Sequence, residues 1–433
     1  MTPRAPGAVQ FVRAAADGAA ARCPASGPGT GRVAACSGPL REKGAAATGL
    51  GAAALERVAR SALRALIGRW RGGAVPDLPG DAFLGEAGIG LDSLEMLEAV
   101  ADLNRRFGLS VTGVEDHLLV NRRLCDWGRL IEAHFELVGD AAELTFSTSG
   151  STGTPKEIDH RLPGLLAEID ALSGALWPDA ADAPSRVLAL VPAHHIFGFL
   201  LTVLLPGRLG VEVVDLSGKG PGALGRLGRP GDLVVATPHL LSLALNTMKP
   251  TGGLTAVVSG APTPDALWQM ASDRDVALIE IYGATETAGI GYRRSPHAGF
   301  ALMPHLDRAG PGIFAPGRGQ LDVQDRVRWL GPRSFVLEGR KDNSVQVAGV
   351  NVSPQATGRH LERTDGVAAA AVRLDAQSGR LKAFVIAKPG EDEAVLEVSL
   401  RMGAEALPAA ARPARYTFGL RLPTTPAGKL SDW

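Results

Sequence analysis

The chain has 433 residues, of which 45% are hydrophobic and 21% charged, enough apolar sequence for about two to four folded domains. Lys and Arg together number 45, as do Asp and Glu, so no net charge favours nucleic acid or an anionic membrane as a partner. The longest dense apolar stretch, 196–205, is too short to span a bilayer, and three cysteines without CxxC spacing indicate neither a zinc site nor a disulfide framework. A cytoplasmic protein is the expectation.

The first part of the chain changes character near residue 52. Residues 1–51 are rich in Ala, Gly, Pro and Arg and have no sustained hydrophobic period, which predicts a disordered tail. Residues 52–137 predict helices instead, because apolar residues recur at three- and four-residue spacing. The first such stripe consists of Leu55, Val58, Ala62, Leu66 and Trp70, and others run through 96–107 and 124–135.

The triplet Asp92-Ser93-Leu94 lies at the start of the second predicted helix. It resembles the signature of acyl and peptidyl carrier proteins, and the resemblance implies a 4'-phosphopantetheine arm on Ser93, added by a phosphopantetheinyl transferase. A helix start suits a phosphodiester because its free N–H groups and dipole favour an anion. The alternative is that Asp92 caps a helix in a fixed packing unit. No Gly/Ser linker follows Phe135, which favours that alternative.

The run TFSTSGSTGTPK, from Thr145 to Lys156, combines seven hydroxyl residues with two glycines and a terminal cation. Glycine lets the backbone approach an anion closely, and lysine supplies a point charge for a phosphate. It is not a Walker P-loop, which needs Gly before the Lys and Ser or Thr after it. We expect phosphate to be bound by Thr148, Ser149, Gly150, Ser151, Thr152, Gly153 and Lys156.

Five short apolar runs then predict the buried strands of an α/β sheet. They are VLALV (187–191), VEVVDL (211–216), DLVVAT (232–237), TAVVS (255–259) and ALIEIY (277–282). In such sheets ligands bind at the carboxyl ends of the strands. The segments SGAP (259–262) and YGATE (282–286) both fall at such ends.

Four blocks in this order resemble the adenylate-forming superfamily of acyl-CoA synthetases, aryl-acid ligases and peptide synthetase adenylation domains. They are the hydroxyl-rich run, YGATETAG, GRKDNSVQVAG and PTTPAGKLSDW. The resemblance implies a multidomain α/β protein with an N-terminal four-helix carrier-like module at 52–137, a shortened adenylate-forming core at 138–341 and a small C-terminal α+β lid domain at 342–433. The shortened core is similar to ligases of aryl polyene pathways, which would place the protein in secondary metabolism.

The resemblance also implies the roles of individual residues. ATP would be bound with Mg²⁺ on Glu286, since Mg²⁺ prefers carboxylate and phosphate oxygens. The substrate carboxylate would attack the α-phosphate, and Lys429 would neutralise the charge that gathers there, with Thr285 on phosphate. Asp342 would be the hinge. The adenine and ribose would be held by Gly260, Ala261, Tyr282, Gly283, Asp325 and Arg340.

The segment PAHHIFGF, 192–199, matches the superfamily's acid pocket and brings in His194, His195 and Phe197. Amino-acid-activating relatives place an Asp near the position of His195, and a histidine offers no such fixed anion for an ammonium group. A flat, uncharged acid such as a hydroxybenzoate or a cinnamate is therefore favoured, and medium-chain fatty acids stay open. The alternative is that the histidines are simply polar residues at a strand end.

The sequence thus predicts ATP-dependent activation of a small carboxylic acid, with an aromatic acid favoured, and transfer of the acyl group to a phosphopantetheine thiol. The leading hypothesis for the acceptor is an acyl carrier protein, either the chain's own Ser93 arm or a separate partner. One alternative is an acyl- or aryl-CoA ligase that uses free CoA beside a vestigial module. The alternative of another class is a non-catalytic scaffold that only binds nucleotide.

Overall fold

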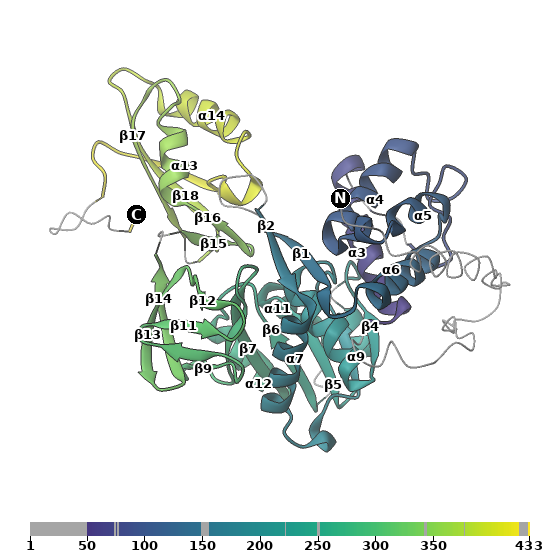
Figure 1. Cartoon of the computed structure of the whole chain (residues 1–433). Coiled ribbons are helices and arrows are strands. Elements are labelled where there is room, and N and C mark those ends of the chain that lie inside the picture. The colour runs from purple at the N-terminus through teal and green to yellow at the C-terminus, as the bar shows by residue number, and fades with distance from the viewer. Residues whose placement is uncertain are drawn as a thin grey trace.

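The computed structural model describes residues 50–433 apart from 73–74, 76–77, 149–155, 221, 249–251, 342–343, 376 and 424–431. Its centre is a nine-stranded sheet in the order β13-β14-β9-β8-β7-β6-β5-β3-β4. A helical module lies to one side of this sheet and a small C-terminal domain to the other (Figure 1). The predicted 1–51 tail falls almost wholly outside the described residues.

One half of the sheet is parallel and confirms the five predicted strands. They are β3 (Arg186–Ala189), β4 (Glu212–Asp215), β5 (Asp232–Ala236), β6 (Leu254–Val258) and β7 (Val276–Ala284). Alternate side chains enter two different hydrophobic clusters, one shared with α7 (Leu162–Leu176) and the other with α11 (Pro238–Thr247) and α12 (Asp265–Ser272). Helices therefore cover both faces, as a parallel sheet requires.

The other half is antiparallel and contains β8 (Ala288–Arg293), β9 (Phe300–Leu302), β14 (Ser334–Arg340) and β13 (Asp325–Gly331). Beside it lies a three-stranded sheet of β10 (Asp307–Ala309), β11 (Gly312–Ala315) and β12 (Gly319–Leu321). Earlier in the chain than the strands of the large sheet, β1 (Glu143–Thr148) and β2 (Lys156–Arg161) form an antiparallel hairpin that leads into α7.

The helical module consists of α3 (Ala52–Arg71), α4 (Ser93–Phe107), α5 (Val114–Val120) and α6 (Leu124–Val138). The predicted cap is confirmed: the Asp92 side chain accepts hydrogen bonds from the backbone N–H groups of Leu94 and Glu95, and the Glu95 side chain accepts one from Asp92. Buried residues of these helices belong to the same hydrophobic cluster as β1, α7 and one face of the sheet.

A chain of short helices connects β3 to β4. It comprises α8 (Ile196–Phe199), a π-helical turn at Leu200–Leu204 and α9 (Leu205–Leu209). A five-residue helix, α10 (Ala223–Leu227), precedes β5. The π-helical turn is fully buried, and α3 of the helical module packs against it.

The small domain starts with β15 (Val345–Val347), β16 (Val350–Val352) and α13 (Pro354–Leu361). It continues with β17 (Val367–Leu374), β18 (Leu381–Ala387), α14 (Glu393–Ala404) and β19 (Arg415–Phe418). Its apolar residues form a hydrophobic cluster of their own. Within the described ranges, no helix combines the length and apolar character needed to cross a membrane.

Candidate active site

The predicted site residues gather at the carboxyl edge of the parallel strands. In the β6–β7 register, Val258 lies opposite Glu280, and Gly260 and Tyr282 each follow two positions further along the chain, towards that edge. Gly260 has a φ of +87°, a left-handed conformation that favours glycine. Ala261 follows it, and Gly283 continues β7, so four of the residues predicted for adenine and ribose belong to the ends of two neighbouring strands and the segments that follow them.

Tyr282 and Asp325 are 43 positions apart in sequence but form a short hydrogen bond, in which the phenol donates to the carboxylate at 2.6 Å. Burial, reinforced by the Asp325 carboxylate, raises the pKa of Tyr282 well above its usual range, so the phenol stays protonated and donating. Arg340 faces Asp325 across the β13–β14 ladder. The resemblance to a family grouped these three residues around one nucleoside, and the fold places them side by side.

The Thr285–Glu286 turn between β7 and β8 is held by two residues that the sequence analysis missed. His160 on β2 lies with its Nε2 2.6 Å from the Thr285 backbone oxygen, so this nitrogen donates. Arg318 donates to the backbone oxygens of Glu286 at 2.7 Å and Thr287 at 3.3 Å. Burial lowers the pKa of His160 and keeps its ring neutral. The hairpin that carries the hydroxyl-rich run is thereby fastened to this turn.

A third missed residue, Glu168 on α7, lies beneath the same turn. Its carboxyl group is buried and accepts a hydrogen bond from the backbone N–H of Gly289 at 2.8 Å. Burial raises the pKa of Glu168 to about 8, so the group is predominantly neutral at pH 7. The signal in the sequence was weak, because Glu168 is one of two acids, with Asp170, in the otherwise apolar helix LPGLLAEIDALSGAL.

Parts of the predicted phosphate and catalytic apparatus lie outside the described residues, namely Ser149 to Gly153, Asp342 and Lys429. Thr148 and Lys156 are described and pair with each other at the end of the β1–β2 hairpin where the chain passes from one strand to the other. The Thr148 hydroxyl donates to the Lys156 backbone oxygen at 3.4 Å. The hydroxyl-rich run therefore joins two adjacent strand ends.

In the predicted acid pocket, the two histidines have different surroundings. His194 is buried, with its Nδ1 2.8 Å from the Ser61 hydroxyl of α3, whereas His195 is exposed. The centroids of the two imidazole rings lie 4.2 Å apart. Phe197 is half-buried next to them. Burial, with smaller effects of His195 and Arg106, lowers the pKa of His194 to about 2. The His195 side chain reaches solvent at its edge, but the protein around its ring removes enough water, with a further effect of Arg106, to lower its pKa too, so both rings are neutral near pH 7.

The donors for a metal ion are few. No group of three or more His, Cys, Asp or Glu side chains that could hold a metal occurs in the described part of the chain. At Glu286 the guanidinium of Arg318 binds the backbone oxygen and not the carboxylate. A single carboxylate fits Mg²⁺ that takes most of its ligands from phosphates and water, so the residues present suit the predicted ion.

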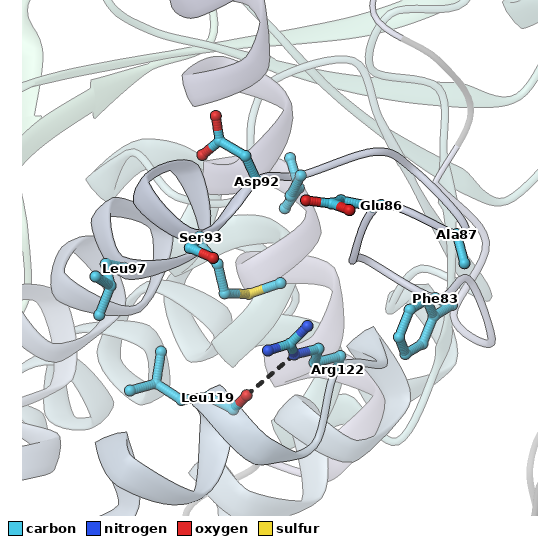
Figure 2. A pocket seen from close by; sticks show the side chains of 10 residues that line it. Phe83, Glu86, Ala87, Asp92, Ser93, Leu97, Leu119 and Arg122 are labelled. Carbon is cyan, nitrogen blue, oxygen red and sulfur yellow. Dashed lines mark hydrogen bonds between the residues drawn. The ribbon is translucent and has the colours of Figure 1, made fainter.

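Ser93 is the first residue of α4 and is exposed. It borders a hollow of about 510 Å³ that is lined by both apolar and charged side chains, including Phe83, Leu97 and Arg122 (Figure 2). The apolar side chains of Leu94 and Leu97 on the same helix are 76% and 51% exposed, which leaves this face of α4 open to a partner.

Comparison with known proteins finds a family model, described as AMP-binding enzyme, that matches residues 139–314. A 4-coumarate–CoA ligase of Rhodobacter capsulatus is 44% identical over 389 residues, covering 88% of this chain and 100% of the relative. A 4-coumarate–CoA ligase of Cereibacter sphaeroides is 43% identical over 358 residues, covering 82% and 86%. The solved amide bond synthetase McbA from Marinactinospora thermotolerans shares the fold, with a TM-score of 0.51, 23% identity, and coverage of 66% of this chain and 67% of that one.

The extent of these matches bears on the helical module. The part of the chain from β1 to residue 433 makes up about two thirds of it, so a match over 88% reaches well into the helices that precede β1. Helices of this module therefore belong to what the chain has in common with the Rhodobacter capsulatus relative.

Proposed function

The chain belongs to the adenylate-forming superfamily of AMP-binding enzymes and is an AMP-forming acid–thiol ligase, and we propose that it joins an aromatic acid of the hydroxycinnamate class to coenzyme A. The observation that carries this proposal is the 44% identity, over 100% of its length, to a relative named 4-coumarate–CoA ligase. Activation of the acid by ATP follows from the family. A non-catalytic scaffold is set aside, because the chain belongs to an enzyme class.

The acceptor is the point at which the proposal departs from the leading hypothesis of the sequence analysis. That hypothesis favoured an acyl carrier protein. Two relatives at 44% and 43% identity are both named CoA ligases, which supports the alternative of free CoA. The shared hydrophobic cluster of the helical module and the sheet supports the same choice, since a module fixed in this way is poorly suited to shuttle an acyl group.

The candidate acid-binding segment supports an aromatic acid. His195 is exposed beside the half-buried Phe197, and both histidines carry neutral rings near pH 7. Imidazole and phenyl rings offer flat contact surfaces and no anion for an ammonium group. Phe199, by contrast, is buried and packs edge-to-face against Phe146 at 5.5 Å, so it supports the site from beneath.

The chemistry proceeds in two steps with balanced bonds. In the first, an oxygen of the acid carboxylate attacks the α-phosphorus of ATP, and pyrophosphate leaves as the acyl adenylate forms. In the second, the deprotonated thiol attacks the acyl carbon, and AMP leaves as the thioester forms. Both steps bring anions together, so the protein acts mainly by charge neutralisation and in-line positioning.

We assign the groups as follows. The hydroxyl-rich run and Lys156 hold the departing pyrophosphate, and Tyr282, Asp325 and Arg340 hold the nucleoside. Glu286 would hold Mg²⁺, which supplies positive charge to the phosphate oxygens when bound. Lys429 supplies the remaining positive charge in the first step, and Asp342 is the hinge of the small domain.

The first experiment is acid-dependent ATP–pyrophosphate exchange across cinnamates, benzoates, fatty acids and amino acids. We expect exchange with hydroxycinnamates and little with amino acids. Acyl-CoA formation is then measured by mass, with free CoA compared against a phosphopantetheinylated carrier protein as acceptor. Exchange with no acid of the panel would refute the proposed activity, and a preference for the carrier would refute the choice of CoA.

Modification of Ser93 is a second candidate, favoured by its exposed hydroxyl beside the hollow at the start of α4 (Figure 2). In this case the chain would carry its own 4'-phosphopantetheine arm. Incubation with CoA and a phosphopantetheinyl transferase, followed by intact mass spectrometry, tests it directly. No added mass on wild type, under conditions that modify a known carrier protein, rules the arm out.

A further inference from the structure

A buried polar contact joins the helical module to the candidate acid-binding segment. Ser61 lies in the middle of α3, and its hydroxyl is 2.8 Å from Nδ1 of His194, 133 positions away. Both side chains are buried, at 8% and 7% exposure. A buried polar group without a partner is costly, so this pairing fixes the orientation of the His194 ring.

A second contact comes from Arg106 on α4. Its Nη1 donates to the backbone oxygen of His194 at 3.2 Å, while its Nε donates to the Asp102 carboxylate at 2.6 Å. Asp102 thereby holds the guanidinium in place. The positive charge close to both imidazoles disfavours their protonation, in addition to the larger effect of burial.

A third contact holds the π-helical turn that follows this segment in the chain. The Arg57 side chain of α3 donates to the backbone oxygen of Thr202 in the buried π-helical turn. Such turns interrupt the regular helical pattern and leave carbonyl oxygens available for other donors. Residues of the helical module thus hold the segment at His194 and the turn that follows it at Thr202.

From these contacts we infer that the helical module forms one wall of the acid-binding site, with Ser61 and Arg106 as positioning residues that act through His194. This inference rests on the proposed function. The exposed His195 ring lies 4.2 Å from the buried His194 ring at an interplanar angle of 41°. A shift of His194 therefore changes the surface on which His195 meets the acid, and the module takes part in selecting the substrate.

The test compares Ser61→Ala and Ser61→Cys with Ser61→Thr in the full chain. Alanine removes the hydroxyl, cysteine keeps similar volume with a weak donor, and threonine restores the hydroxyl. Ser110→Ala is the matched control, an exposed serine of the same module. The readouts are the KM values for 4-hydroxycinnamate and for ATP in pyrophosphate exchange, the unfolding midpoint, and the nitrogen-15 resonances of the His194 ring, assigned with His194→Gln.

We expect Ala and Cys to raise the KM for the acid about tenfold and to change the KM for ATP by less than about twofold, the size of one lost hydrogen bond. The His194 Nδ1 resonance shifts in both, and Thr restores both readouts. An unchanged acid KM with a shifted resonance overturns the inference, as does an equal loss in both KM values with lowered stability. If wild type exchanges with no acid, the proposed function fails, whereas an unshifted His194 resonance refutes the positioning role independently of activity.

Discussion

The helical module and the small C-terminal domain flank the same sheet but are attached to it in different ways (Figure 1). Buried residues of α3 to α6 belong to one hydrophobic cluster with the hairpin, α7 and the sheet, and Ser61 crosses the boundary with a buried hydrogen bond. The small domain has a separate cluster that includes Val347, Leu361 and Leu400. A domain with its own core can rotate as a unit, whereas the module must move with the sheet.

This difference assigns different tasks to the two regions. A fixed module can shape a binding surface, which is the role that the contacts around His194 support. A separately packed domain can bring a cation to the site for one step and withdraw it for the next, as proposed for Lys429. A carrier domain that swings between partners would need a core of its own, like the small domain. The helical module instead shares its core with the sheet.

The largest expected effect comes from breaking the shared core at Trp127. This side chain of α6 is fully buried, and Trp127→Ala should lower the free energy of unfolding by about 3–5 kcal/mol. Because the module and the sheet share a cluster, we expect both to unfold in one earlier transition, with loss of exchange activity. Calorimetry combined with hydrogen exchange monitored by mass spectrometry measures both.

The matched variant is Leu400→Ala in the small domain, also fully buried, with an expected cost of about 2–5 kcal/mol. Here the loss of protection should be confined to 344–423, and the transition of the sheet should stay at its wild-type temperature. Faster hydrogen exchange throughout the sheet in Leu400→Ala, or only within the module in Trp127→Ala, would show that the two attachments do not differ.

Substitution of Lys429 tests whether the small domain supplies its cation in only one of the two half-reactions. Lys429→Ala should reduce pyrophosphate exchange by about 10²–10³-fold, the usual cost of losing one preorganised group that stabilises transition-state charge. Thioester formation from a supplied acyl adenylate should change by less than about threefold, because the lysine acts only in the first step. Lys388→Ala is the control, an exposed lysine of the same domain paired with Asp365. Equal losses in both half-reactions would contradict the division of labour.

The pH dependence of the free energy of unfolding tests the contact that Glu168 makes between α7 and the β7–β8 turn, within the part of the molecule that shares one core. Its pKa in the folded protein, about 8, lies above the ordinary value of 4.5, so the folded state holds a proton that the unfolded state releases. The resulting stabilisation is complete below about pH 4.5 and is lost as the pH rises through 8. Glu168→Gln keeps a neutral acceptor for the Gly289 N–H. The stability of wild type relative to this variant should therefore fall between pH 5 and 9, by an amount on the order of a few kcal/mol.

Urea unfolding of both proteins at several pH values measures this difference. Parallel pH profiles for wild type and Glu168→Gln would mean that Glu168 is ionised in the folded state. In that case the neutral link between α7 and the β7–β8 turn would be wrong.

Periodicity and composition were enough for much of the fold. Five parallel strands, the first helices and the cap at Asp92 all have local causes, because alternation, apolar runs and capping residues act within a few positions. The Tyr282, Asp325 and Arg340 group could be predicted only through resemblance to a family. Its members meet because β13 and β14 add to the edge of the sheet beyond β9, an arrangement that no local pattern encodes.

The missed residues share one physical property: each acts through a long-range contact with backbone. His160 and Arg318 bind carbonyl oxygens of the Thr285–Glu286 turn, and Glu168 binds the N–H of Gly289. Almost any residue type can supply a backbone N–H or carbonyl oxygen, so the residue at the partner position does not reveal these contacts, and sequence motifs cannot predict them. The contact of Ser61 with His194 joins two side chains, but one serine in an amphipathic helix is an ordinary feature of sequence.

The smallest effect is expected for Tyr282. This residue and its partner Asp325 lie close to the point where the sheet, which is fixed to the module, leads into the separately packed small domain. Tyr282→Phe keeps the ring, which packs near Phe300 and Phe335 at 5.7 and 6.0 Å, and removes only the hydrogen bond to Asp325. Asp325 opens β13, opposite the last residue of β14, just before the chain enters the small domain. If Asp325 binds the ribose from the fixed side, the KM for ATP should rise about tenfold. Both half-reactions should weaken, unlike in Lys429→Ala, since the nucleotide stays bound through both. Tyr292→Phe on β8 is the control, and an unchanged KM for ATP in Tyr282→Phe would remove Asp325 from the nucleotide site.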